Sequence, residues 1–138
     1  MGRRRRSREL ALQVLYQLDI TKKDAHQALA QLRENFITKE DDHEFTERIV
    51  LGVIEHCLEM DRLIEKYSEH WQLGRMMIID LNILRMAIFE LLYCKEIPPK
   101  VSLNEAIDLG KRYGSEESGS FINGILDRIQ NEVVHKSL

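Results

Sequence analysis

The stretch LNILRMAIFELLY, residues 81–93, constrains the fold of this chain most strongly, because it is apolar on nearly every side. Only Asn82, Arg85 and Glu90 interrupt it. A helix that is hydrophobic all round must be covered by other elements. The stretch therefore predicts a helix at the centre of a helical bundle.

Apolar residues recur at helical spacing along most of the remaining chain, and no alternating segment of useful length competes. We expect a first helix capped by Ser7, a second over residues 25–36, and one long helix running from Phe45 to Tyr67 behind caps at Asp41 or Asp42. A short helix or turn is expected over residues 73–79.

The adjacent prolines Pro98 and Pro99 should end the central helix. Ser102 and Glu105 have the spacing of a capping box for the next helix, and Gly114 suits its C-terminal end. A last helix follows Phe121. The 138 residues thus predict a single all-α domain of about seven helices, with a polar division near residue 70 between an N-terminal half (1–70) and a C-terminal half (71–138).

Positive charge is concentrated at one end of the chain. Of 20 lysines and arginines, five arginines (Arg3, Arg4, Arg5, Arg6 and Arg8) stand in the first eight residues, which leaves 15 against 23 acidic residues elsewhere. Clustered guanidinium groups bind phosphates and stack on bases. We expect a flexible basic arm that follows single-stranded RNA and becomes ordered on binding, and an acidic body suited to a basic protein partner.

The sequence offers little support for catalysis. The five histidines are scattered without metal-ligand spacing, and we find no phosphate-binding glycine loop or nucleophile motif. We therefore expect no enzyme activity, no cofactor and no metal. With no apolar run of membrane-spanning length, and two distant cysteines within apolar patterns, we expect a cytoplasmic protein.

A second candidate surface is SEESGSFINGILDR, residues 115–128. At 100° per residue, Phe121 falls at the margin of the apolar stripe centred on Ile122, close to the helix start. An aromatic ring beside exposed backbone N–H groups suits base stacking and phosphate binding, although a ring at this margin also serves as a cover for the core. Gly119 has no side chain, so a ligand could come close to the backbone there. Gly124 suggests that another helix or a partner packs closely against this helix.

Several motifs, in this order and spacing, resemble the NusB family of bacterial transcription antitermination factors. They extend over nearly the whole chain and comprise RRSRE (residues 5–9), LRMA (84–87), EL (90–91), NEAIDL (104–109) and FINGILD (121–127). The resemblance implies an all-helical fold of two small helical bundles and a non-enzymatic RNA-binding factor. It also implies pairing with NusE, a ribosomal protein, binding to the single-stranded boxA RNA of ribosomal RNA leaders, and action with RNA polymerase, NusA and NusG.

The resemblance carries specific residues onto this chain. Arg4, Arg5, Arg6 and Arg8 match the RNA-contacting arginines of the family, Arg3 extends that run, and Phe121 matches an RNA-contacting aromatic residue. The other matching positions, at or near the RNA surface, are Tyr67, Asp80, Arg85 and Glu117. Ser120 departs from the family pattern, because lysine is common there, and the change removes one phosphate contact.

Two alternatives remain open from the residues. One is a helical RNA-binding domain of an RNA-modifying enzyme, which would require a further domain with a methyl-donor site. The other is a protein-interaction scaffold whose arginines are only a basic tail. The sequence does not determine the oligomeric state, so a homodimer stays among the partners considered.

Overall fold

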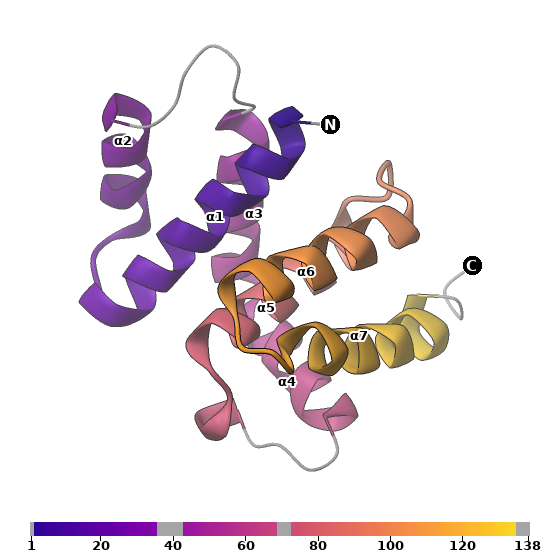
Figure 1. Cartoon of the computed structure of the whole chain (residues 1–138). Coiled ribbons are helices and arrows are strands. Elements are labelled where there is room, and N and C mark those ends of the chain that lie inside the picture. Colours follow the sequence, from indigo (N-terminus) through magenta and orange to yellow (C-terminus); the bar gives the residue numbers. More distant parts are fainter. Residues whose placement is uncertain (1, 36–42, 69–72, 135–138) are drawn as a thin grey trace. The chain divides into compact units, whose positions relative to one another are not determined.

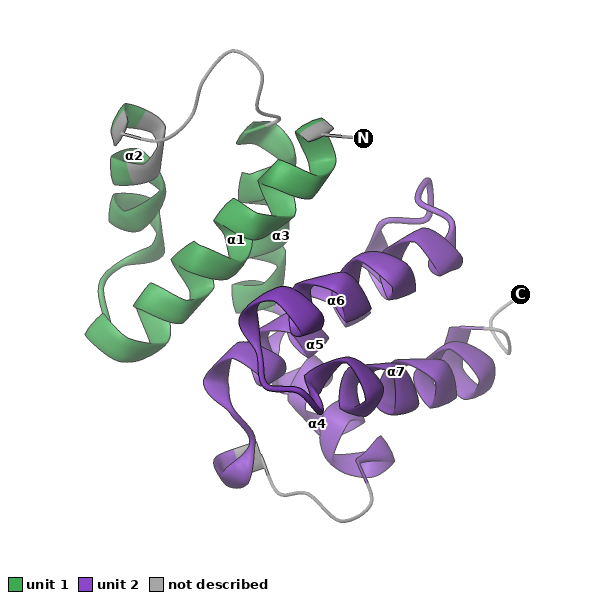
Figure 2. Ribbon diagram, in the orientation of Figure 1, with its two compact units in different colours: residues 1–55 green, residues 56–138 purple. Residues whose placement is uncertain are grey.

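The computed structural model describes residues 2–35, 43–68 and 73–134, which form helices joined by short turns (Figure 1). It contains no strand in them, which confirms the predicted all-α class. The chain divides into two compact units, residues 1–55 and 56–138 (Figure 2), whereas the sequence suggested a division near residue 70. No described helix is both long and apolar enough to cross a bilayer.

The first unit contains α1 (Gly2–Thr21), α2 (Ala25–Asn35) and α3 (His43–Glu55). These helices pack against one another around a core that includes Leu10, Val14, Leu29 and Ile49. Asp24 caps α2, because its Oδ2 accepts hydrogen bonds from the backbone N–H groups of His26 and Gln27. The predicted caps Asp41 and Asp42, and Phe36, lie outside the described residues.

The second unit contains α4 (Cys57–Tyr67), the 3₁₀ turn η1 (Leu73–Arg75), α5 (Ile78–Tyr93), α6 (Pro99–Tyr113), α7 (Ser118–Ile129) and the π-helical turn η2 (Gln130–Val134). Helix α5 contacts α4, α6, α7 and η2. It buries eleven residues, among them Ile83, Leu84 and Ile88. The predicted central helix is therefore confirmed.

The expected long helix from Phe45 to Tyr67 is wrong, because it is divided at His56. This residue adopts φ −107° and ψ 19°, outside the helical region, and separates α3 from α4. Its ring stacks on that of Tyr93, with 4.2 Å between the centroids. A one-residue break leaves the apolar spacing almost in phase, so periodicity alone did not reveal it.

The predicted capping box at Ser102 is also wrong. Helix α6 begins at Pro99, which is tolerated in a first turn because the N–H that proline lacks has no helical acceptor there. Ser102 lies inside α6, and its hydroxyl donates a hydrogen bond to Glu90 Oε1 of α5 at 2.8 Å. Both residues are buried, so a polar contact joins the two helices within the core.

Helices α6 and α7 approach closely, and two glycines allow it. A Cβ at Gly110 would lie 2.7 Å from Ile122 Cδ1, and one at Gly114 would collide with the side chain of Ser118 and with Gly110 O. Gly114 ends α6, as the sequence predicted. These contacts hold the turn between the two helices, which carries part of the candidate site.

We predict that Ser102→Ala lowers the free energy of unfolding by about 1–3 kcal/mol, because Glu90 loses a hydrogen-bond donor in a buried position. Urea denaturation followed by circular dichroism measures the change. The matched control is Ser120→Ala on exposed Ser120 of α7. An equal loss in both variants would contradict a special role for the Ser102–Glu90 contact.

Candidate nucleic-acid interface

The arginine-rich N-terminus is helical, and the expectation of a flexible arm is wrong. Helix α1 begins at Gly2, so Ser7 is not its cap. Ser7 is fully buried, its hydroxyl donates to Arg3 O at 2.8 Å, and its own carbonyl accepts from Thr46 Oγ1 at 3.1 Å. The latter bond ties the first turns of α1 to α3, which orders the basic segment.

Phe45 of α3 provides a platform for two of the arginines. The guanidinium carbons of Arg4 and Arg8 lie 4.3 Å and 5.2 Å from the centroid of its ring. Residues four apart share one face of a helix, which explains why these two meet the same ring. Arg8 is only 3% exposed. It therefore packs α1 on α3 and presents little surface to a ligand, and the RNA contact expected for it stays a prediction.

The remaining arginines face outward. Arg3 and Arg6 are exposed and Arg5 is half-buried. The first turn of α1 contains no acidic residue. Because the N-terminus of a helix already carries partial positive charge, arginines there add to it. This end of α1 is therefore a strongly electropositive surface that favours anions.

A second candidate surface is a pocket in the second unit with a volume of about 170 Å³. It lies between the N-terminal end of α5 and the turn that leads into α7. Three of the residues predicted from the sequence, Asp80, Glu117 and Phe121, come together in its lining. Binding pockets for drug-sized molecules are larger, at ~300–1,000 Å³, so this one suits a single small ring system.

Asp80 is the chemically unusual residue of this pocket. It is 6% exposed, and its Oδ1 finds no hydrogen-bond partner among the described residues. Burial raises the pKa of the carboxyl above its ordinary value, and the nearby Ser118 hydroxyl opposes the shift in part. A buried carboxylate oxygen without a partner favours a ligand that brings an N–H donor.

The turn between α6 and α7 supplies the opposite wall. Ser118 Oγ accepts a hydrogen bond from the Ser115 backbone N–H at 2.8 Å, and the two hydroxyls lie 3.2 Å apart. Ser118 is buried, whereas Ser115 and Glu117 are exposed. The closed turn holds Glu117 and Ser118 at the start of α7, facing the N-terminal end of α5 across the pocket.

Phe121 lies in the first turns of α7, is half-buried, and lines the pocket. This position agrees with the predicted margin of the core. Gly124 was expected to allow close packing, but a Cβ there would meet no atom of the described chain within 4 Å. Gly119 is buried, not open, and a Cβ on it would lie 3.1 Å from Lys111 Cγ.

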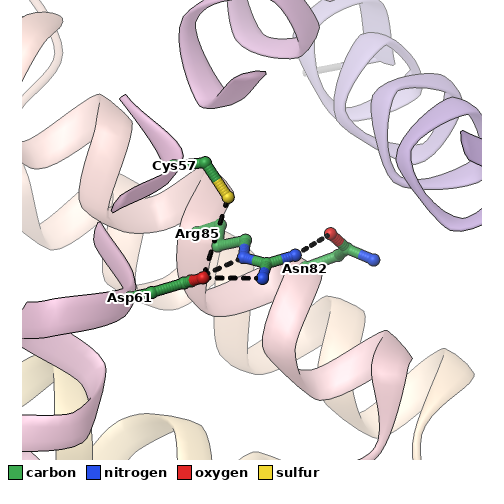
Figure 3. A network of polar contacts seen from close by, with 4 residues as sticks. All are labelled: Cys57, Asp61, Asn82 and Arg85. Atoms are coloured by element: carbon green, nitrogen blue, oxygen red, sulfur yellow. Dashed lines mark hydrogen bonds and ion pairs between the residues drawn. The ribbon is translucent and has the colours of Figure 1, made fainter. Parts of the chain in front are cut away.

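Arg85 and Tyr67 do not join this pocket. Figure 3 shows Arg85 between two partners: Nε and Nη2 donate to the two oxygens of Asp61 at 2.8 Å and 2.9 Å, and Nη1 donates to Asn82 Oδ1 at 3.3 Å. Asp61 Oδ2 also accepts from Cys57 Sγ at 3.7 Å. Arg85 thus joins α5 to α4 through a bidentate ion pair.

Tyr67 is 8% exposed, and its carbonyl oxygen accepts a hydrogen bond from Arg128 Nη1 of α7 at 3.2 Å. The structure thus shows Tyr67 and Arg85 in contacts between helices of the second unit. These contacts give both residues a structural role, and the RNA contacts expected from the resemblance stay predictions.

Sequence reasoning missed several members of the two surfaces. Phe45 was expected only as the start of a long helix, because its cation–π partners lie far away in the chain. Arg75, Met76 and Met77 line the pocket but belong to no motif, while Ser115 and Ser118 fall in the 115–128 stretch without having been assigned a role. An arginine beside an expected turn was a weak signal for Arg75, and nothing in the sequence linked it to Asp80. Among the described residues, no group of three His, Cys, Asp or Glu side chains could hold a metal ion.

Comparisons with known proteins agree with this fold. A family model described as the NusB family matches residues 5–131. A transcription antitermination protein NusB from Desulfatibacillum aliphaticivorans is 50% identical over 129 residues, which cover 94% of this chain and 90% of that protein. The protein of the same name from Syntrophus aciditrophicus is 46% identical over 137 residues and covers 99% and 85%.

Two solved structures are also similar. That of T. maritima NusB has a TM-score of 0.87 and 40% identity, covering 99% of this chain and 96% of that one. A structure described as the antitermination factors NusB and NusE in complex with dsRNA has a TM-score of 0.82 and 28% identity, covering 98% and 97%.

We predict that Asp80→Asn changes the pH dependence of stability. Because the folded-state pKa is raised above 3.8, the folded state binds the proton more tightly than the unfolded state. Asp80 therefore makes stability fall as pH rises from 3.8 through the folded-state pKa, and Asp80→Asn removes that fall.

Urea denaturation at a series of pH values tests this, with Asp127→Asn, which changes an exposed carboxyl on α7, as the reference variant. Relative to that reference, Asp80→Asn should gain stability over wild type as the pH rises. A relative loss with rising pH would mean that the ionised Asp80 is stabilised in the fold.

Proposed function

Because the chain belongs to the NusB family, whose relatives are named transcription antitermination proteins, we propose that it binds single-stranded boxA RNA as a pair with NusE. In this role it acts in the cytoplasm beside RNA polymerase, NusA and NusG, and helps transcription resist premature termination. The function needs no catalytic group, in keeping with relatives named as transcription antitermination proteins.

The observation that carries this proposal is the electropositive N-terminus of α1. Exposed Arg3 and Arg6 stand at a helix N-terminus that has no acidic residue in its first turn, while Arg4 is stacked on Phe45. An ordered set of guanidinium groups loses less conformational entropy on binding phosphates than a flexible tail would. A polyanionic strand also relieves the mutual repulsion of the arginines.

The pocket of the second unit favours an unpaired base. A ring stacked against Phe121 could offer an amino or imino N–H to Asp80, and Glu117 stands at the same rim as a further acceptor. In a duplex those base edges are already occupied, whereas single-stranded RNA presents them. The similar structure described with NusB and NusE contains dsRNA, so the test below includes a duplex.

The rest of the chain suits the protein partner. Outside the first eight residues, 23 acidic side chains stand against 15 lysines and arginines. Complementary charge accelerates association with a basic ribosomal protein such as NusE. Bound together, the two proteins place more positive surface along the RNA than this chain offers alone.

The central experiment measures fluorescence anisotropy of labelled boxA RNA with the full chain, with and without NusE, at several salt concentrations. Scrambled RNA and a boxA duplex are the comparison probes. NusE should increase the preference for single-stranded boxA. Equal affinity for all three probes in the presence of NusE would contradict the proposal and favour the basic-tail alternative.

We predict that the double variant Arg3→Gln/Arg6→Gln weakens RNA binding and lowers the magnitude of the log–log salt slope by roughly 1.4, at about 0.7 for each phosphate contact on a single strand. Its stability should be unchanged or higher, because like charges are removed from a helix N-terminus. Arg62→Gln, on exposed Arg62 of α4, is the single-charge control. An unchanged slope in the double variant would remove Arg3 and Arg6 from the interface.

We also predict that Phe121→Ala weakens binding of boxA RNA roughly 5- to 150-fold, the equivalent of about 1–3 kcal/mol for one stacked base. Tyr113→Ala, which truncates an exposed aromatic residue of α6 outside the pocket, is the matched control. Circular dichroism must show retained helix in both variants. Loss of helix in Phe121→Ala would show that the ring is needed for the core and would withdraw its assignment to the RNA site.

A further inference from the structure

We infer that Arg75 and Lys111 form a second phosphate-binding site beside the pocket of Asp80 and Phe121, where they hold the backbone of the strand whose base enters the pocket. The inference rests on the proposed function and extends it to two residues outside every motif considered above. It assigns RNA phosphodiester groups as the ligand, bound by this chain in its second unit and separately from the arginines of α1.

Arg75 is the first of the two cations. It ends the η1 turn, is exposed, and lines the pocket together with Asp80 and Phe121. No acidic side chain in the described part of the chain forms an ion pair with it. A guanidinium group in this position is available to bind a phosphate in a bidentate manner.

Lys111, in the last turn of α6, is the second cation. Its aliphatic chain lies across Gly119, because a Cβ on that glycine would be 3.1 Å from Lys111 Cγ and 3.4 Å from Cε. The ammonium group is one bond beyond Cε, so it is held near the first turn of α7. As with Arg75, no ion pair is formed by Lys111 within the ranges that the structure describes.

The first turn of α7 adds a hydrogen-bond donor at the same place. Within the described chain, the backbone N–H group of exposed Ser120 makes no hydrogen bond, and Glu117 supplies no side-chain cap. Helix α7 has twelve residues, so its N-terminus carries the usual partial positive charge. A donor of this kind, beside a lysine, suits a phosphate oxygen.

The unpartnered oxygen of Asp80 is an independent indication that a ligand binds here. It is a buried acceptor within the pocket, and a base amino or imino group would satisfy it. The base of a nucleotide in the pocket would leave its phosphate near the rim formed by Arg75 and the start of α7. One nucleotide would thus place its base against the acidic interior of the pocket and its phosphate against the basic margin.

The charges around the pocket explain why both cations are needed. Asp80 lies inside, and Glu116 and Glu117 are exposed on the turn before α7. These carboxylates repel a polyanion, so a strand could approach only where cations offset them. Lys111 reaches α7 from the neighbouring helix and supplies the positive charge that Ser120 lacks, and the small Gly119 provides the space for it.

The test is the double variant Arg75→Gln/Lys111→Gln of the full chain, titrated with single-stranded boxA RNA over a range of salt concentrations. We expect the magnitude of the salt slope to fall by roughly 1.4, at about 0.7 for each phosphate contact. The control, Arg62→Gln/Lys100→Gln, removes the same charge from exposed residues outside the pocket and should change the slope much less. Equal changes in the two variants overturn the inference.

A third variant tests the position of Lys111 without removing its charge. Gly119→Ala places a methyl group 3.1 Å from Lys111 Cγ and displaces the lysine chain. It should weaken RNA binding in the wild-type background and have no further effect in Lys111→Gln. Equal weakening in both backgrounds overturns the role of Lys111, and circular dichroism establishes that the variants keep their helices.

Failure of this inference is distinguishable from failure of the proposed function. If wild type binds the RNA and Arg3→Gln/Arg6→Gln lowers the slope while Arg75→Gln/Lys111→Gln does not, only the second phosphate site is overturned. A wild type that binds no RNA, alone or with NusE, overturns both.

Discussion

The burial of α5 is the constraint on which the second unit depends. A helix that buries eleven residues must be surrounded, and α4, α6, α7 and η2 provide that cover. Its three polar interruptions are each placed by this arrangement: Arg85 pairs with Asp61 of α4, Asn82 accepts a hydrogen bond from Arg85, and Glu90 meets Ser102 of α6. Its first turn brings Asp80 to the turn before α7. The candidate pocket is thus a consequence of how the central helix is covered.

The first unit depends on a different constraint, because it holds several positively charged arginines close together at the start of α1. Arginines at a helix N-terminus repel one another and the helix dipole. Part of that cost is offset by the stacking of Arg4 and Arg8 on Phe45 and by the hydrogen bond from Thr46 to Ser7 O. The exposed arginines then project from an ordered support. In the proposed function, RNA phosphates neutralise the charge that remains.

The predictions that succeeded and those that failed have a common explanation. Periodicity identified the central helix and the margin position of Phe121, because both follow from where apolar residues recur along one helix. Periodicity missed the break at His56, because one extra residue hardly shifts the phase of the apolar repeat. The spacing of Ser102 and Glu105 also misplaced the start of α6. It resembles a capping box in sequence, but Ser102 donates its hydrogen bond to Glu90 of another helix. The burial of Arg8 and the ion pair of Arg85 depend on Phe45 and Asp61, residues distant in the chain.

The sequence by itself determined the helical class, the buried character of α5 and the concentration of arginines at one end, because composition and local spacing carry that information. Only the tertiary structure decided which arginines face outward, that one oxygen of Asp80 is buried without a hydrogen-bond partner among the described residues, and which side chains share a pocket. Asp80, Phe121 and Arg75 come together through the packing of α5 and α7 and the position of η1. Those contacts join residues far apart in the chain, and a local sequence pattern does not predict them.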